Sequence, residues 1–205
     1  TPAAAFTTRD MLGREVTLAA PPARIVSLVP SVTEILYALK AEDMLVGVTD
    51  FCDFPPQARR KPSVGGMVAP SLEAVAALRP DLVIATTEGT REDTFTQLTR
   101  LGIPVYLVAV HRVAEVKALI VRLGGLTGRQ AAAGAIVTRL EQRIDAVTKA
   151  VGSRDRPRVL YVLWPEPLIV PGRDTIVTEL IQLAGGRSLT ADDPDSWPRY
   201  SLEAA

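Results

Sequence analysis

The chain has few residues with which to carry out acid–base, nucleophilic or metal chemistry. Its 205 residues include one histidine, His111, and one cysteine, Cys52. A lone imidazole leaves few choices for proton transfer, and protein sites for bare zinc or manganese need several histidines and carboxylates. The sequence also lacks a nucleophile elbow, a phosphate-binding loop and a dinucleotide-binding fingerprint. These observations favour a binding protein over an enzyme.

Cys52 and His111 could each have a structural role instead of a chemical one. Cys52 could ligate cobalt or iron through a thiolate, but a small apolar residue in a loop is much commoner. It has no second cysteine with which to form an internal disulfide. His111 follows an expected strand, and strand ends face ligands in parallel sheets. The alternative is that His111 caps a helix beginning near Val113.

Trp197 and Met67 occupy equivalent places before two similar segments. Trp197 lies four residues before Ser201-Leu202-Glu203, and Met67 lies four residues before Ser71-Leu72-Glu73. An indole ring suits a large flat ligand, because stacking adds to the burial of area. The alternative for Trp197 is a surface position or packing within the core of a lobe. Glu73 and Glu203 also correspond, and a carboxylate in a first helical turn stabilises the helix dipole whatever its function.

Two further phrases occur twice in the same order. Arg24-Ile25-Val26-Ser27-Leu28 is similar to Arg158-Val159-Leu160-Tyr161-Val162, and Thr33-Glu34-Ile35-Leu36 is similar to Thr178-Glu179-Leu180-Ile181. Three matched phrases predict two similar α/β lobes, and clefts between domains commonly bind small ligands. The second copy stops where its third phrase begins. We therefore expect an incomplete second lobe and a chain that is a fragment of a longer protein.

Strand and helix patterns alternate through the first part of the chain. After a hairpin over residues 6–20, we expect strands over 24–29, 45–48, 82–85 and 105–110. The expected helices begin at a capping-box pattern over 31–34 and at a Ser71 cap, with a third helix over 94–101. This alternation is typical of a parallel sheet flanked by helices.

A long helix separates the two expected lobes. Apolar residues recur along one helical face of residues 127–151, at Ala133, Val137, Leu140, Ile144, Val147 and Val151. Thr127-Gly128-Arg129-Gln130 has a capping-box pattern at its start. We expect an N-terminal lobe over residues 1–126, a connecting helix over 127–152 and a truncated C-terminal lobe over 153–205. A rigid helical connector would permit only small movements of the lobes.

Charge and hydropathy exclude several classes of partner. Lys plus Arg and Asp plus Glu both total 23, so there is no cationic surplus for nucleic acid. No run of about 18 apolar residues is present that would span a bilayer. The first residues lack a charged segment followed by an apolar one, so any export signal has been removed or was never there.

Four segments carry a resemblance to a known family: residues 24–34, the Asp53-Phe54-Pro55-Pro56 loop, Ser71-Leu72-Glu73 and residues 79–84. They resemble the substrate-binding proteins of bacterial ABC importers for cobalamin, haem and iron-siderophores, most of all those for cobalamin. The similarity runs in order from about residue 6 to residue 205. It implies an α/β fold of two lobes of parallel sheet flanked by helices and bridged by one long helix. The second lobe would be incomplete here.

The resemblance also implies roles for individual residues. Ligand contacts are expected from an aromatic group at Trp197, Phe51 and Trp164, and from Met67 and Thr86, where relatives can carry aromatic residues. Packing is the alternative for Phe51 and Trp164, and Phe54 could equally pack against its prolines. One acidic residue per lobe, Glu73 and Glu203, would dock onto arginines of the membrane permease.

We therefore expect a periplasmic or extracytoplasmic receptor, either with or without a lipid anchor. It would be a monomer that captures cobalamin between its lobes and delivers it to an ABC import permease. Cobalamin would be cargo, and no catalytic cofactor or resident metal is expected. Basic residues such as Arg173 and Arg199 would favour an anionic ligand, so haem or an iron-siderophore remains the alternative. A chain that acts only through protein contacts is the other.

Overall fold

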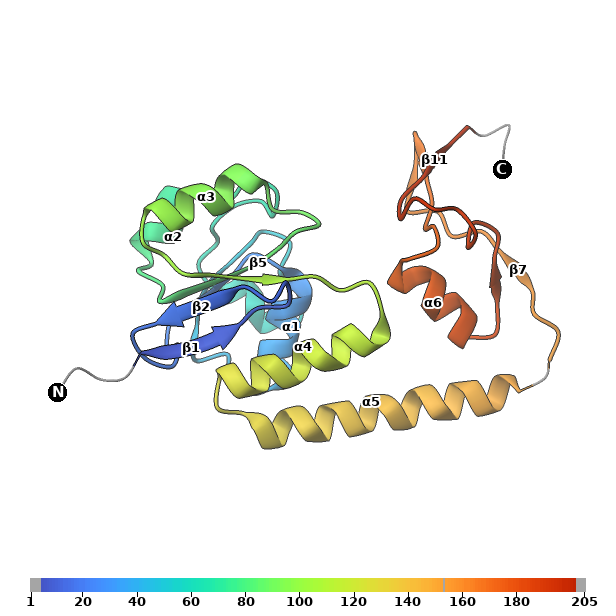
Figure 1. Cartoon of the computed structure of the whole chain (residues 1–205), viewed down its shortest axis with the longest axis horizontal. Coiled ribbons are helices and arrows are strands. Elements are labelled where there is room, and N and C mark those ends of the chain that lie inside the picture. The colour runs from blue at the N-terminus through green and yellow to red at the C-terminus, as the bar shows by residue number, and fades with distance from the viewer. Residues whose placement is uncertain (1–4, 153, 202–205) are drawn as a thin grey trace. The chain divides into compact units, whose positions relative to one another are not determined.

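The computed structural model describes residues 5–152 and 154–201, which form two compact units. The first unit contains the described residues up to Ala109 together with Ala118–Ile136. The second contains Val110–Lys117 and the described residues from Val137 onward. Each unit has its own strands and helices (Figure 1). Among the described residues, no helix combines the length and apolar character needed to cross a membrane.

A four-stranded parallel sheet forms the centre of the first unit. Its strands are β3 (Ile25–Ser27), β4 (Leu45–Val48), β5 (Leu82–Thr86) and β6 (Val105–Val108), in the order β4-β3-β5-β6. Nearly every residue of these strands is buried, as expected for a parallel sheet covered on both faces. The predicted parallel α/β sheet is therefore confirmed.

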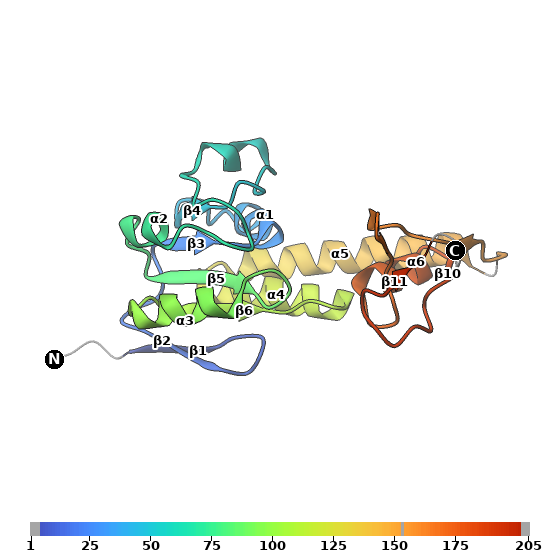
Figure 2. The same ribbon diagram turned by 90° about the horizontal axis from the view of Figure 1, so that it is seen from above.

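Helices cover both faces of this sheet (Figures 1 and 2). Helices α2 (Leu72–Ala77) and α3 (Glu92–Arg100) lie on one face, where Val75 and Leu98 pack on a core formed by alternate strand residues. Helix α1 (Pro30–Ala38) packs against β3 and β4 on the other face. A short 3-10 helix, η1, spans Pro56–Arg60. The carboxyl ends of the strands are thereby held in fixed positions.

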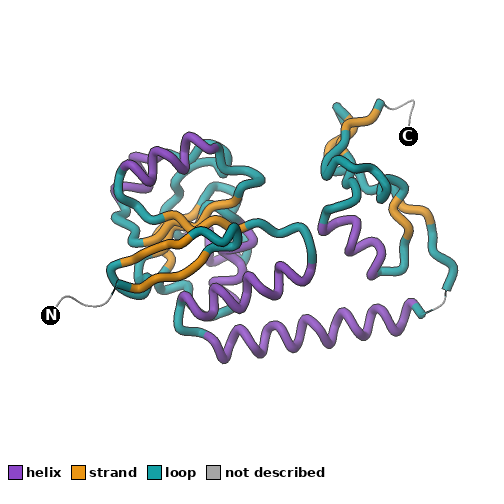
Figure 3. The backbone as a smooth tube through the Cα atoms, viewed as in Figure 1, coloured by secondary structure: helices purple, strands orange, loops and turns teal. Residues whose placement is uncertain are grey.

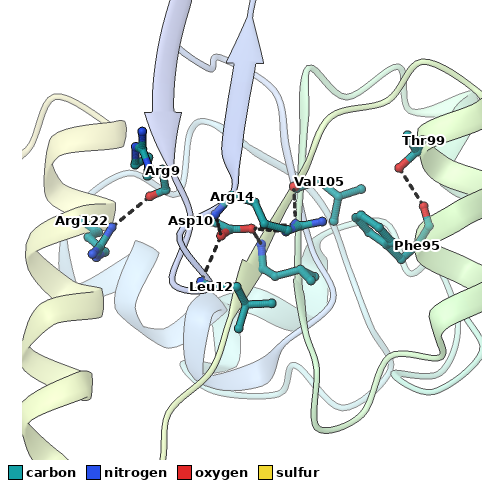
Figure 4. A network of polar contacts seen from close by, with 9 residues as sticks. Arg9, Asp10, Leu12, Arg14, Phe95, Thr99, Val105 and Arg122 are labelled. Atoms are coloured by element: carbon teal, nitrogen blue, oxygen red, sulfur yellow. Dashed lines mark hydrogen bonds and ion pairs between the residues drawn. The ribbon is translucent and has the colours of Figure 1, made fainter.

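The N-terminal hairpin joins the first unit through a buried carboxylate. Strands β1 (Phe6–Arg9) and β2 (Glu15–Leu18) pair antiparallel around a turn in which Gly13 has a φ of +79°. Asp10 accepts hydrogen bonds from the backbone of Leu12 at 3.0 Å and from the Nη2 atom of Arg14 at 2.6 Å (Figure 4). The guanidinium of Arg14 also lies 4.5 Å from the ring centre of Phe95 on α3. The hairpin is therefore part of this unit's packing.

Helices α4 (Val113–Leu126) and α5 (Gln130–Val151) each have residues in both units. The predicted long helix is confirmed, but its start differs from the capping-box pattern. Thr127 donates its hydroxyl hydrogen to Leu123 O at 2.7 Å and lies outside α5. The capping-box prediction at Thr127 was wrong because this residue directly follows α4 and its hydroxyl bonds back to that helix.

The capping-box prediction at Ser31 is also wrong. Helix α1 begins at Pro30, and its N-cap residue, Val29, forms no side-chain cap bond. Proline suits the first helical position because the N–H that it lacks would be unsatisfied there. Ser31 therefore falls inside the helix. The Ser71 cap is confirmed, since its hydroxyl accepts a hydrogen bond from Ala74 N at 3.2 Å.

The second unit has shorter strands and more loop (Figure 3). Strand β7 (Arg158–Val159) pairs parallel with β10 (Arg187–Ser188), and α6 (Ile176–Leu183) lies between them in sequence. A separate antiparallel sheet has the order β11-β9-β8, from β8 (Trp164–Pro165), β9 (Leu168–Ile169) and β11 (Arg199–Tyr200). The parallel pair with its helix corresponds to β3, α1 and β4 of the first unit.

The segment that is similar to residues 24–28 forms a strand only over Arg158–Val159. Residues 160–163 are outside the named strands, and their side chains are exposed. Strand β7 has one partner, β10, over two residues. Because β7 is paired over only two residues and the side chains of residues 160–163 are exposed, the strand does not continue through this apolar segment.

Candidate functional site

Phe51 projects from the loop that follows β4, at the carboxyl edge of the parallel sheet. Its side chain is 63% exposed. The loop backbone is fixed by hydrogen bonds from Cys52 N to Thr49 O at 3.0 Å and from Asp50 N to Gly65 O at 2.9 Å. Ligands of open α/β sheets bind at this edge. An exposed ring on a fixed loop there is suited to ligand contact.

The thiol of Cys52 anchors the same loop from beneath. Cys52 is 3% exposed, and its Sγ atom lies 3.2 Å from the hydroxyls of both Thr33 on α1 and Thr49. Thr33 also contacts the Ser27 hydroxyl at 2.9 Å, which ties this group to β3. These contacts give Cys52 a structural role in holding the loop.

Met67 and Thr86 lie against the same glycine. A Cβ atom placed on Gly89 would be 2.7 Å from Met67 Cε and 3.6 Å from Thr86 Cγ2. The structure therefore brings together two expected ligand contacts that are 19 positions apart in the sequence. A side chain at position 89 would displace Met67. The sequence analysis did not include Gly89, although a glycine three residues after a buried strand is a signal for close approach.

Two exposed apolar side chains near this edge were also missed or left open. Phe54 is 61% exposed, and Val68 next to Met67 is 54% exposed. Both belong to loops that join the strands of the first unit. Their exposure could be detected only in the folded chain, because an apolar residue in a loop is usually predicted to pack against the rest of the protein.

Trp164 is held by its own hairpin in the second unit. Its indole N–H donates a hydrogen bond to Glu166 O at 3.0 Å, while the residue remains 59% exposed. Strand pairing places Trp164 opposite Ile169, and Ile169 opposite Arg199. Directly paired residues share one face of a sheet. Trp164 and Arg199 therefore flank Ile169 on a common face.

Trp197 precedes β11 in the same unit and is 36% exposed. Its neighbour Pro198 is buried and accepts a hydrogen bond from Val170 N at 3.3 Å. Gly172 fits tightly there, because a Cβ atom would lie 1.8 Å from Asp195 O. Trp197 thus projects from a segment whose backbone is fixed on both sides.

The guanidinium of Arg173 is occupied by a contact within the second unit. Its Nη2 atom donates a hydrogen bond to Asp192 O at 2.9 Å. Nearby, the Tyr200 hydroxyl donates to Asp193 Oδ2 at 2.7 Å, and this bond raises the pKa of Tyr200 above its ordinary value. Arg199 is therefore the better placed of the two arginines for an anionic ligand.

Glu73 is exposed in the first turn of α2, two residues after the Ser71 cap. Glu203 lies outside the described residues. At the start of α4, the Glu115 carboxylate accepts hydrogen bonds from the backbone N–H groups of His111, at 2.5 Å, and Arg112, at 3.1 Å. Within residues 5–152 and 154–201, no group of three or more metal-ligating side chains comes together.

A parallel sheet with fixed, exposed apolar and aromatic residues at its carboxyl edge defines an α/β ligand-binding fold. Residues 25–205 match the Periplasmic binding protein family, and the chain belongs to that family. This membership confirms the predicted class: periplasmic-type substrate-binding proteins of ABC importers in the cobalamin, haem and siderophore group.

Individual relatives include binding proteins for two macrocycles. The Vitamin B12-binding protein of Pectobacterium carotovorum is 27% identical over 184 residues, which are 89% of this chain and 67% of the relative. The structure of the periplasmic vitamin B12 binding protein BtuF of Vibrio cholerae superposes with a TM-score of 0.80 at 29% identity, over 90% of this chain and 72% of that one. A periplasmic heme binding protein from Pseudomonas aeruginosa has a TM-score of 0.83 at 29% identity, over 89% and 67%.

The chain spans about two thirds of the length of the curated relatives that it matches. These relatives are named as binding proteins rather than enzymes, in agreement with the scarcity of catalytic side chains. Of the two solved structures, one is named for vitamin B12 and the other for haem, and each is 29% identical to this chain.

Proposed function

We propose that the chain is the receptor of an ABC importer, located outside the cytoplasmic membrane, that captures cobalamin and delivers it to the permease. The vitamin B12-binding relatives support this choice of ligand. In the proposed organisation, residues 1–126 form one lobe, 127–152 the connecting helix and 153–205 the start of a second lobe. Cobalamin is captured in a cleft between two lobes, as cargo rather than as a catalytic cofactor.

The observation that carries the proposal is the way Trp164 is presented. Its one polar atom is satisfied by Glu166 O within the same hairpin, so the ring can contact a ligand without leaving a polar group unpaired. The ring is also largely exposed before any ligand binds. Burial of such a ring against a corrin would remove apolar area from water at little conformational cost, because the hairpin already fixes it.

The other ligand contacts in the proposal come from Trp197, Phe51, Met67 and Thr86. Phe51 supplies a third flat ring, and Met67 is an adaptable apolar surface beside Thr86. Several such contacts suit a macrocycle, because each large apolar side chain adds to a continuous wall. A ligand carried by stacking and burial needs no metal ligand from the protein.

Delivery to the permease is proposed to use Glu73, together with Glu203. The Glu73 carboxylate is exposed and fixed to the first turn of α2 by the Ser71 cap. Such a charge can pair with an arginine of a membrane partner while the receptor remains a monomer. Charge complementarity of this kind sets the specificity and rate of association more than its strength.

Haem is the second ligand candidate, and one contact favours it. Arg199 lies across Ile169 from Trp164 on the same face of the antiparallel sheet. A guanidinium beside an aromatic ring could pair with a carboxylate of a bound macrocycle, since arginine binds carboxylates in a bidentate manner. The haem-binding structural relative supports the same alternative.

Calorimetric titrations with cyanocobalamin, haem and a ferric siderophore would test the proposal. We expect saturable one-to-one binding of cyanocobalamin with a dissociation constant of about 1 μM or lower. Trp164→Ala and Trp197→Ala should each weaken it by about tenfold, because both stacking and burial are lost. Val121→Ala, at an exposed position on α4, is the control and should bind like the parent.

If only haem binds, and Arg199→Ala abolishes that binding, the ligand is haem rather than cobalamin and the proposed receptor role stands. If none of the three ligands binds to folded protein, the macrocycle proposal is wrong. Equal affinity of the parent and both tryptophan variants would show that the proposed rings do not contact the ligand.

A further inference from the structure

A groove of about 380 Å³ lies between α2 and α3 on the first unit. It is lined by residues of both helices and of the α3 terminus: Leu72, Glu73, Ala76, Gln97, Arg100 and Leu101. The two helices pack against one another on the same face of the sheet (Figures 1 and 2). We call this feature the α2–α3 groove.

The apolar part of the groove is rigid. Leu72 and Ala76 are one helical turn apart on α2, so they share a face. Leu101, which is 56% exposed, is the C-cap of α3. Hydrogen bonds from Ile103 N to Leu98 O and from Gly102 N to Thr99 O, each 3.0 Å, close this helix in a Schellman motif. The leucine is thus fixed in an exposed position.

Opposite charges line the same groove without pairing. Glu73 lies on the α2 side and Arg100 on the α3 side. Over residues 5–152 and 154–201, neither side chain forms a hydrogen bond or an ion pair. By contrast, Arg91 near the start of α3 pairs with Asp93 at 3.0 Å. An unpaired cation and anion beside an apolar floor can both be satisfied by a partner.

We propose that the α2–α3 groove receives one apolar side chain of the importer's permease. The permease segment would present an arginine next to that side chain, to pair with Glu73, and a carboxylate or carbonyl to accept from Arg100. This inference rests on the proposed function and extends it. It assigns part of the docking contact to burial of Leu101, because a surface ion pair alone contributes only about 0–1 kcal/mol.

The combination of features carries the assignment. Single exposed leucines are ordinary on protein surfaces. Here the leucine lines a hollow, its position is fixed by a helix cap, and both flanking charges are unpaired. A central apolar contact surrounded by polar groups is the usual organisation of a protein interface. A partner protein with a complementary charge pair therefore fits the groove better than a small apolar ligand.

The test compares two leucines of the same unit. Leu101→Asp places a charge in the groove, whereas Leu12→Asp places one on the N-terminal hairpin, where Leu12 is 47% exposed. Binding to the permease–ATPase complex of the importer, reconstituted in lipid nanodiscs, would be measured by biolayer interferometry. We expect Leu101→Asp to weaken binding by about tenfold or more, and Leu12→Asp to change it by less than about twofold.

Two further variants separate this inference from the proposed function. Arg100→Glu should weaken docking by several-fold, while ligand titration and thermal unfolding stay like those of the parent. If the parent binds the permease and Glu73→Arg abolishes binding, but Leu101→Asp binds like the parent, the groove assignment is wrong and docking through Glu73 stands. If the parent does not bind the permease at all, the proposed function itself fails. A dimer in solution that Leu101→Asp dissociates would assign the groove to a second copy and overturn the proposal.

Discussion

The two units contain similar apolar segments in different surroundings. In the first unit, Ile25–Ser27 form β3 between β4 and β5, and residues 25–28 are fully buried. In the second, residues 160–163 follow a two-residue strand, and their side chains are exposed. The phrases have similar β propensity, so the difference lies in the neighbours. A buried parallel strand requires neighbouring strands and helices that cover its side chains, as well as the right sequence.

The largest expected effect tests this difference in burial. Leu28→Ala removes a fully buried side chain and should lower the free energy of unfolding by about 3–5 kcal/mol. Leu163→Ala removes an exposed side chain and should cost less than about 0.5 kcal/mol. Denaturant titration would be followed by far-UV circular dichroism. Both tryptophans lie in the second unit, so their fluorescence follows that unit separately. Equal costs at the two leucines would contradict the comparison.

A smaller effect is expected for the carboxylate that holds the N-terminal hairpin. Asp10→Ala leaves the backbone N–H groups that it satisfies, among them that of Leu12, without an acceptor, and should cost about 2–3 kcal/mol. The corresponding test in the second unit is Asp174→Ala. Asp174 pairs with Arg112 at 2.7 Å, but both side chains are more than half exposed, so the cost should stay below about 1 kcal/mol. A larger loss at Asp174 than at Asp10 would reverse this ranking.

The smallest effects concern helix caps and should be similar in the two units. Ser71→Ala removes the cap of α2, and Thr175→Ala removes the cap of α6. Each should cost about 1 kcal/mol, with more at Thr175 because its buried hydroxyl also donates to Gly172 O at 3.2 Å. Ser31→Ala is the matched control, since Ser31 is not a cap, and it should cost less than about 0.5 kcal/mol. Similar losses of unfolding free energy at the two caps would show that the units differ in packing rather than in local sequence signals.

The sequence predicted most of the first unit because its signals were local and mutually consistent. Apolar runs such as residues 82–85 correspond to strands, and Ser71 is a true cap. The capping-box pattern at Ser31 failed because the preceding proline can begin a helix by itself. Local patterns of this kind cannot show which of two adjacent residues will be the first in a helix.

Less of the candidate site could be predicted, because it depends on residues distant in sequence. The expected contact residues Met67 and Thr86 meet at Gly89, which only the fold reveals. Arg199 reaches the face of Trp164 through strand pairing with Ile169. The groove beside Glu73 arises from two helices whose sequences give no sign of it. Pairings of this kind follow from tertiary packing rather than from spacing along the chain.

The buried thiol of Cys52 allows opening of the Phe51 loop to be measured by the rate of thiol labelling. Cys52 is the one thiol in the sequence, and its burial means that a thiol reagent can reach it only when the loop opens. If opening is fast compared with reaction, the labelling rate is the intrinsic rate multiplied by the open fraction. A ligand that contacts Phe51 would lower that fraction, so occupancy could be followed by slowed labelling, without any added probe or change of sequence.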